Sequence, residues 1–334
     1  VERGEVKEYY SELTDIARTY IEEAVEETED SASGQEEDSD SEAGDGNHRR
    51  VRKRRRATDV NPDEVNTDDP NTVVRVRAPR EKSPTRGSTR LDAKRQRRKD
   101  GRDAVVAARA AFAKWSEATA YNRAQVLYRV SEIMQGRREQ FVEELSLWSK
   151  TKKQAENEVD EAINRMVWFA GWADKIAMVT GSNNPVAGPF FDFSIPEPTG
   201  VVAAVAPEDS ALLGLVETIA SIVVSGNTVI VIASESQPLP AVSLAEVIAT
   251  SDVPGGVINI LTGSYKEIAP WLASHQDVNA LDLTGVDKKQ IALELEKEAA
   301  VNLKRVLRPN TKLDGLARIK VFLETKTVWH PRGF

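Results

Sequence analysis

Apolar residues recur along the chain with two different spacings, and the change between them falls near residue 200. Before that point they return every three or four positions, which is the spacing of one helix face. This spacing predicts three amphipathic helices, over 104–115, 121–147 and 159–178. After residue 200, short uninterrupted apolar runs alternate with amphipathic stretches. Such runs are typical of buried strands separated by helices.

Four strand–helix pairs follow from the second spacing. The predicted strands are 201–206, 228–232, 257–261 and 279–283, and the predicted helices are 211–224, 238–250, 266–274 and 287–307. Continuous apolar strands that each precede a helix indicate a parallel sheet covered on both faces. Right-handed crossovers then give a doubly wound, Rossmann-like α/β fold. Ligands of such sheets bind at the carboxyl ends of the strands, here 207–210, 233–237, 262–264 and 284–287.

The first hundred residues have a different character. Residues 1–46 hold 3 basic and 17 acidic residues, whereas residues 47–102 hold 19 basic and 8 acidic residues. No Phe, Trp or Tyr occurs between Ile21 and Arg102. Such a segment buries too little apolar surface to offset its chain entropy. We therefore expect residues 27–98 to be a disordered linker, first acidic and then basic.

A further amphipathic pattern precedes that linker. Between Glu5 and Val25 the apolar and aromatic residues recur at helical spacing, which predicts a helix within residues 1–26. The favoured interpretation is a marginal helix that needs a partner face to be stable. The alternative is a helix that docks on another protein.

Composition limits the chemistry of these 334 residues. They contain no cysteine and only three histidines, so disulfides, thiolate metal sites and a thiol nucleophile are excluded, and we expect no metal site. No apolar run reaches the length of about 18 residues that a membrane-spanning helix needs. Residues 1–10 carry charges where a signal peptide has an apolar stretch. We expect a cytoplasmic protein without membrane contact.

Polar residues at the predicted strand ends are the candidate ligand groups. No glycine-rich dinucleotide fingerprint follows the first strand, and no phosphate-binding loop of the Gly-Lys-Ser/Thr type occurs. Ser234 and Glu235 could form hydrogen bonds to a ribose, and Thr284-Gly285 could offer backbone N–H groups to a phosphate. Each of these positions also suits an ordinary helix cap, and spacing alone favours caps.

Several short motifs fall in the order found in the aldehyde dehydrogenase superfamily. They are Pro198–Ala203, Gly226–Val229, Ala233–Glu235, Pro254–Asn259 and Leu283–Gly285, after a helical stretch from Ala104 to Leu127. From about residue 98 to the end, the chain resembles that superfamily, and most closely a divergent actinobacterial branch. The resemblance implies a helical part over 99–199, an NAD(P)-binding domain over 200–309 and a C-terminal tail over 310–334. It implies these cofactor-binding residues for NAD or NADP: Pro207, Ser234, Glu235, Thr284 and Gly285.

The same resemblance implies that the catalytic positions are lost. Where the family has Trp-Asn after the proline of the first loop, this chain has Glu208-Asp209, and a carboxylate would repel a developing oxyanion. The family's ribose-binding Lys is replaced by Ile232, and the Ser of its pyrophosphate turn by Val286. The Glu-Leu-Gly-Gly motif, the nucleophilic cysteine and the catalytic domain expected beyond about residue 309 are not found. We therefore expect no catalytic residues and a weak or vestigial cofactor site.

The basic segment has a resemblance of its own. Residues 71–102 are similar to the basic linker of actinobacterial ribonuclease E/G proteins. The favoured function is a non-catalytic aldehyde dehydrogenase-like protein that pairs with an active relative. A second hypothesis is non-specific RNA binding through Arg49–Arg56 and Arg75–Arg102, because arginine-rich segments bind phosphates. A third is an NAD-dependent oxidoreductase acting on aldehydes by family descent.

Overall fold

The computed structural model describes residues 88–148, 150–309, 311 and 313–332. Contacts divide the chain into a unit of Val1–Ala93 and a unit of Lys94–Phe334, and the fold described below is that of the second unit. The helix predicted within residues 1–26 and most of the predicted linker lie outside the described residues.

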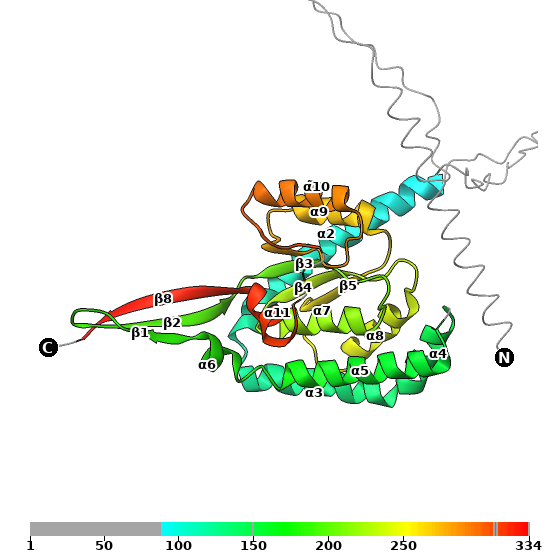
Figure 1. Ribbon diagram of the computed structural model, residues 1–334. Helices are drawn as coiled ribbons and strands as arrows, with labels where there is room; N and C mark the ends of the chain where they lie inside the picture. The colour runs from blue at the N-terminus through cyan, green and yellow to red at the C-terminus, as the bar shows by residue number, and fades with distance from the viewer. Residues whose placement is uncertain (1–87, 149, 310, 312, 333–334) are drawn as a thin grey trace, which may run out of the picture. The chain divides into compact units, whose positions relative to one another are not determined.

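The described part of this unit begins with a run of helices, and from residue 201 onward strands and helices alternate (Figure 1). The helices are α2 (Ser88–Glu117), α3 (Ala120–Gly136), α4 (Arg138–Ser146), α5 (Lys152–Ala170), α6 (Ile176–Thr180), α7 (Leu213–Val223), α8 (Leu239–Ala249), α9 (Tyr265–Ser274), α10 (Lys289–Ala300) and α11 (Gly315–Val321). The strands are β1 (Ser182–Asn184), β2 (Phe190–Pro198), β3 (Val201–Val205), β4 (Thr228–Ile232), β5 (Ile258–Leu261), β6 (Ala280–Asp282), β7 (Arg305–Leu307) and β8 (Leu323–Pro331).

A five-stranded parallel sheet forms the centre of the unit. Its order is β5-β4-β3-β6-β7, so the strand that comes first in the sequence lies in the middle. This is the 3-2-1-4-5 order of a doubly wound, Rossmann-like sheet, in which the strand order reverses between β3 and β6. The predicted parallel α/β sheet is therefore confirmed, with one more strand than the sequence predicted.

Successive residues of each strand face opposite helix layers. On β3, Val202 and Ala204 belong to the core formed with α3, α5, α7 and α8, whereas Val201, Ala203 and Val205 pack with α2, α9 and α10. Because both faces are covered, every residue of β3 and β4 is buried, which explains their uninterrupted apolar sequence.

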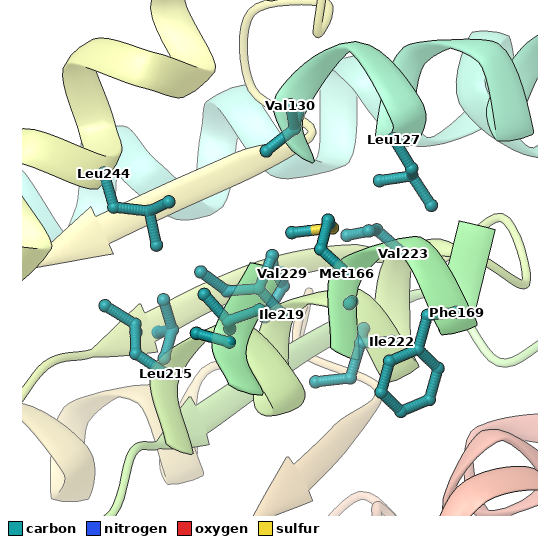
Figure 2. Packing of buried hydrophobic residues seen from close by; sticks show 14 of the residues in the cluster. Leu127, Val130, Met166, Phe169, Leu215, Ile219, Ile222, Val223, Val229 and Leu244 are labelled. Atoms are coloured by element: carbon teal, nitrogen blue, oxygen red, sulfur yellow. The ribbon is translucent and has the colours of Figure 1, made fainter. Parts of the chain in front are cut away.

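The first of these cores is built mainly between helices (Figure 2). Side chains from α3, α5, α7, β4 and α8 meet there, and those labelled in Figure 2 are Leu127, Val130, Met166, Phe169, Leu215, Ile219, Ile222, Val223, Val229 and Leu244. The aromatic Phe169 at helical spacing is thus a core residue.

A second, antiparallel sheet has the order β1-β2-β8. β2 and β8 pair along their whole length, from Phe190 opposite Pro331 to Pro198 opposite Leu323. Residues 310–334, expected as a tail, therefore contain α11 and a sheet strand. The sequence did not reveal this strand because its backbone partner lies more than a hundred residues away in the chain.

Two predicted helices are interrupted. The helix predicted over 121–147 breaks at Arg137, whose φ of −104° and ψ of 16° are not helical, and forms α3 and α4. The helix predicted over 159–178 begins earlier, at Lys152, and is followed by the separate α6.

The last predicted helix is too long, because residues 305–307 form the fifth strand of the sheet. After α10, Leu303 takes a left-handed conformation with φ of 58° and reverses the chain. The buried Lys304 then donates to the carbonyls of His275 and Val278 at 2.6 and 2.8 Å, and burial lowers its pKa. These bonds place β7 beside β6.

α2 begins ten residues before the predicted end of the disordered linker. Its later part packs on the sheet through Ala104, Val105 and Ala108, and Arg97 pairs with Glu267 of α9 at 2.5 Å. Once packing has nucleated the helix, each further residue adds a hydrogen bond at little entropic cost, so the helix extends back to Ser88.

Candidate functional site

The carboxyl ends of β3, β4 and β6 meet at one edge of the parallel sheet, which we call the carboxyl edge. Pro207 follows β3, Ser234 and Glu235 follow β4, and Thr284 and Gly285 follow β6. The structure thus brings all five predicted site residues to one edge, at the position where doubly wound sheets bind ligands.

The loop after β3 leads into α7, and a carboxylate of the chain binds the start of this helix. Glu158 of α5 accepts hydrogen bonds from the backbone N–H groups of Leu212 and Leu213 at 3.1 and 3.4 Å, and it pairs with Lys150. A helix N-terminus favours an anion, and Glu158 supplies one from within the chain. Pro207 packs on Gly214, where an added Cβ would lie 3.0 Å from the proline ring.

The loop after β4 binds a second carboxylate, that of Glu208. The Ser234 and Ser236 hydroxyls donate to it at 2.7 and 3.0 Å. The backbone N–H groups of Glu235 and Ser236 donate to it at 3.0 and 3.3 Å. Ser234 is not the N-cap of α8, since Pro238 holds that position, so the cap favoured by spacing is wrong here.

The turn after β6 is organised by a third carboxylate, the fully buried Asp282. One of its oxygens accepts from the Thr284 backbone N–H at 3.0 Å and from the Thr284 hydroxyl at 2.6 Å. Its other oxygen forms an ion pair with the buried Arg318 of α11 at 2.8 Å. Thr284 is not the cap of α10 either, because the N-cap is Lys288.

Gly285 lets the loops after β3 and β6 approach each other closely. Its N–H donates to the Val205 carbonyl at 3.2 Å, and an added Cβ would lie 2.3 Å from the Ala206 carbonyl oxygen. No side chain other than hydrogen fits at this distance. The backbones of the two loops are therefore in direct contact at the point where strand order reverses.

A tyrosine links the next two loops. The buried Tyr265, the first residue of α9, donates to the Asp287 carboxylate before α10. Burial and the neighbouring carboxylate raise the pKa of Tyr265 to about 12, and the same hydrogen bond lowers the pKa of Asp287. Both groups keep their ordinary charge at neutral pH, so the pair holds the loops together rather than exchanging a proton.

Glu235 differs from the other acids of the carboxyl edge. Its side chain is exposed, and no hydrogen bond or ion pair to it is found within the described part of the chain. Its carboxylate is thus available to accept hydrogen bonds from hydroxyl groups of a ligand such as a ribose.

A polar cavity of about 430 Å³ lies at the opposite edge, beside the amino ends of β3, β6 and β7. Its charged lining residues already pair with each other, since Arg305 binds Glu324 at 2.7 Å. Among the described residues no helix is long and apolar enough to cross a membrane, and no group of three His, Asp or Glu residues is arranged to hold a metal ion.

Sequence reasoning missed the internal partners of the carboxyl edge. Asp282 could have been noticed, because it is the one charged residue within the four predicted strands. Glu158 and Arg318 have no such local signal, since each reaches the edge from a distant segment.

Comparison with known proteins identifies the origin of this fold. A sequence model of the aldehyde dehydrogenase family matches residues 76–310, more than half of the chain. The chain belongs to the aldehyde dehydrogenase family. It is 30% identical over 228 residues to omega-crystallin from Nototodarus sloanii and 32% identical over 208 residues to cytosolic aldehyde dehydrogenase 1 from Elephantulus edwardii. It spans less than half of these relatives, 44% and 41% of their lengths.

Solved aldehyde dehydrogenases share the fold. A betaine aldehyde dehydrogenase from Staphylococcus aureus, solved in complex with NAD⁺, is 26% identical with a TM-score of 0.59. The match covers 63% of this chain and 41% of that one. An aldehyde dehydrogenase structure from Burkholderia cenocepacia is 28% identical with the same TM-score.

The carboxyl edge of this chain fits such a dinucleotide only in part. Glu235 is exposed and suits ribose hydroxyls. The N–H and hydroxyl groups at the start of α7, in the loop of Glu235 and in the turn after β6 bind Glu158, Glu208 and Asp282 of the chain itself.

Proposed function

We propose that these residues form a non-catalytic member of the aldehyde dehydrogenase family with a degenerate NAD or NADP site. The observation that carries the proposal is the internal occupation of the carboxyl edge. Carboxylates of the chain bind the donors at the start of α7, in the β4–α8 loop and in the turn after β6. A dinucleotide must displace at least one of them, and that requirement reduces its affinity.

Composition limits the chemistry that these residues themselves contribute. Covalent aldehyde oxidation begins with attack of a thiolate on the carbonyl carbon, and the 334 residues contain no cysteine. Asp209 is exposed beside the carboxyl edge, and its negative charge opposes an oxyanion there.

Calorimetric titration of NAD⁺ into the full chain tests the proposed site. We expect a dissociation constant in the millimolar range, about −4 kcal/mol, and no aldehyde-dependent formation of NADH. NADP⁺ should bind no tighter, because Glu208, Glu235 and Asp287 repel its 2′-phosphate. Residual binding should be lost in Glu235→Ala and kept in the control Glu143→Ala, which removes an exposed carboxylate from α4.

Two results would overturn the proposal. Micromolar binding of NAD⁺ by the unaltered chain would show that the internal carboxylates do not restrict the site. Steady turnover of an aldehyde with NAD⁺ would favour the alternative function, an oxidoreductase active by family descent.

The proposal includes a partner, an active family member that retains its thiol. Co-expression of the two chains, followed by size determination of the purified material, should give one complex containing both. Two separate species would remove the pairing from the proposal without affecting the cofactor site. The actinobacterial branch and the ribonuclease E/G-like character of residues 71–102 remain predictions from the sequence.

A further inference from the structure

The carboxylate of Glu208 is bound in the way that proteins bind a small anionic ligand. One oxygen accepts from the Glu235 backbone N–H at 3.0 Å. The other accepts from both serine hydroxyls and from the Ser236 backbone N–H. The four donors converge from three consecutive residues, Ser234–Ser236, and we call this set the serine cradle.

No positive charge takes part in this arrangement. Within the described residues Glu208 has no ion pair with Lys, Arg or His, so its charge is stabilised by neutral N–H and O–H donors alone. Concave sets of backbone N–H groups bind anions on the same principle. The serine cradle therefore does not depend on Glu208 for its donors, since all four come from the loop after β4.

The neighbouring acid shows that this contact is specific. Asp209 is the next residue in the same loop, carries the same charge and is exposed. No hydrogen bond or ion pair of its carboxylate is found in the described part of the chain. Glu208 is thus half-buried because the donors of the serine cradle bind its carboxylate, and Asp209, which lacks such donors among the described residues, provides a matched control.

The serine hydroxyls are held in place by the loop itself. Ser234 Oγ accepts from the Gln237 backbone N–H at 3.2 Å and lies 3.2 Å from Ser236 Oγ. Ser234 is also buried. These contacts do not involve Glu208, so they remain when its side chain is removed.

We propose that the serine cradle is a binding site for a carboxylate group, and that Glu208 is its internal ligand. While Glu208 occupies the serine cradle, it covers Ser234 and the backbone of Glu235, two of the residues assigned to the cofactor. The inference has two consequences. The first, binding of a free carboxylate when Glu208 is removed, is independent of any dinucleotide. The second, tighter binding of NAD⁺ when Glu208 is removed, rests on the proposed function.

Chemical rescue of Glu208→Ala in the full chain tests the site directly. The substitution removes the internal carboxylate and leaves the four donors. Sodium formate, the smallest carboxylate, should raise the melting temperature of this variant by about 2–4 °C and in a saturable way, relative to sodium chloride at equal ionic strength. The unaltered chain and Asp209→Ala should show no difference between the two salts.

Two further variants separate binding from general effects. Glu208→Gln keeps the side chain in the serine cradle, so it should show no formate-specific rise. In the background of Glu208→Ala, Ser236→Ala removes one hydroxyl donor and should abolish most of the rescue. If formate stabilises Glu208→Ala no more than chloride does, or stabilises Asp209→Ala equally, the proposed site is wrong.

Calorimetric titration with NAD⁺ then separates this inference from the proposed function. We expect Glu208→Ala to bind NAD⁺ about tenfold more tightly than the unaltered chain, because no internal ligand competes. Formate rescue with no binding of NAD⁺ to either form would retain the carboxylate site and overturn the cofactor site. Binding of NAD⁺ that is unchanged by Glu208→Ala would overturn the role of Glu208 as a competitor.

Discussion

The ion pair between Arg318 and Asp282 should contribute strongly to stability, because it is buried on both sides. Arg318 is 6% exposed and Asp282 is fully buried. Arg318 also donates to the hydroxyls of Thr218 and Ser221 on α7, at 3.1 and 3.2 Å. The pair therefore joins α11 to β6 and α7, and we predict that Arg318→Met destabilises the fold.

The magnitude follows from the charge that the substitution leaves behind. In Arg318→Met one oxygen of Asp282 keeps its two donors from Thr284, and the other loses the guanidinium of Arg318. Breaking a buried pair in this way costs about 3–5 kcal/mol. For a unit of this size that corresponds to a decrease of roughly 10 °C in melting temperature.

Urea-induced unfolding followed by circular dichroism measures this loss of stability. The urea concentration at the midpoint should fall, while the dependence of the free energy of unfolding on urea concentration should stay the same. The control is Lys326→Met, which removes the exposed pair between Lys326 and Glu197 on β8 and β2 and should change the free energy of unfolding by about 1 kcal/mol or less. The double variant Asp282→Asn with Arg318→Met should be more stable than Arg318→Met alone, because it leaves no uncompensated charge. A loss no greater than that of the control would refute the reasoning.

Four further predictions concern packing, charge and the basic segment. Gly285→Ala should lower the free energy of unfolding by at least about 2 kcal/mol, because the added Cβ would lie 2.3 and 2.4 Å from two carbonyl oxygens. Chemical denaturation measures this decrease. Gly136→Ala at the end of α3 should instead raise the free energy of unfolding by about 0.5 kcal/mol in the same assay, because no atom lies within 4 Å of the new methyl group. A decrease in the free energy of unfolding would contradict this geometry. Within the described residues one carboxylate oxygen of Glu144 is buried without a hydrogen-bond partner, and burial raises the pKa of this group. The stability conferred by its neutral form is therefore lost as pH rises through that raised pKa. Glu144→Gln should therefore be about 1 kcal/mol more stable than the unaltered chain at pH 7 and equally stable near pH 4. A difference in stability that does not change with pH would show that the charge of Glu144 is not its cause. For the basic segments Arg49–Arg56 and Arg75–Arg102, binding of single-stranded RNA should weaken steeply with salt and should fall strongly on deletion of residues 47–87, which removes the first segment and part of the second. Affinity that is insensitive to either change would exclude phosphate contacts.

The sequence alone determined the class of the fold and which residues lie at its carboxyl edge. Continuous apolar runs such as Thr228–Ile232 can be stable only when both faces of a strand are covered, so the parallel sheet and its helices followed from local pattern. Because the carboxyl ends of parallel strands lie at one edge, the predicted strand ends also placed Ser234, Glu235, Thr284 and Gly285 at that edge. The absence of cysteine from these 334 residues and the family resemblance were also legible from residue types.

Only the tertiary structure decided what the residues at that edge bind. The sequence shows Glu208 beside Asp209 as two equivalent acids, yet one is bound by four donors and the other is exposed. Likewise the pairing of β2 with β8, and of Asp282 with Arg318, joins segments far apart in the chain. Periodicity and propensity report on neighbours within a few residues, whereas these contacts depend on which distant groups the packed core brings within hydrogen-bonding distance.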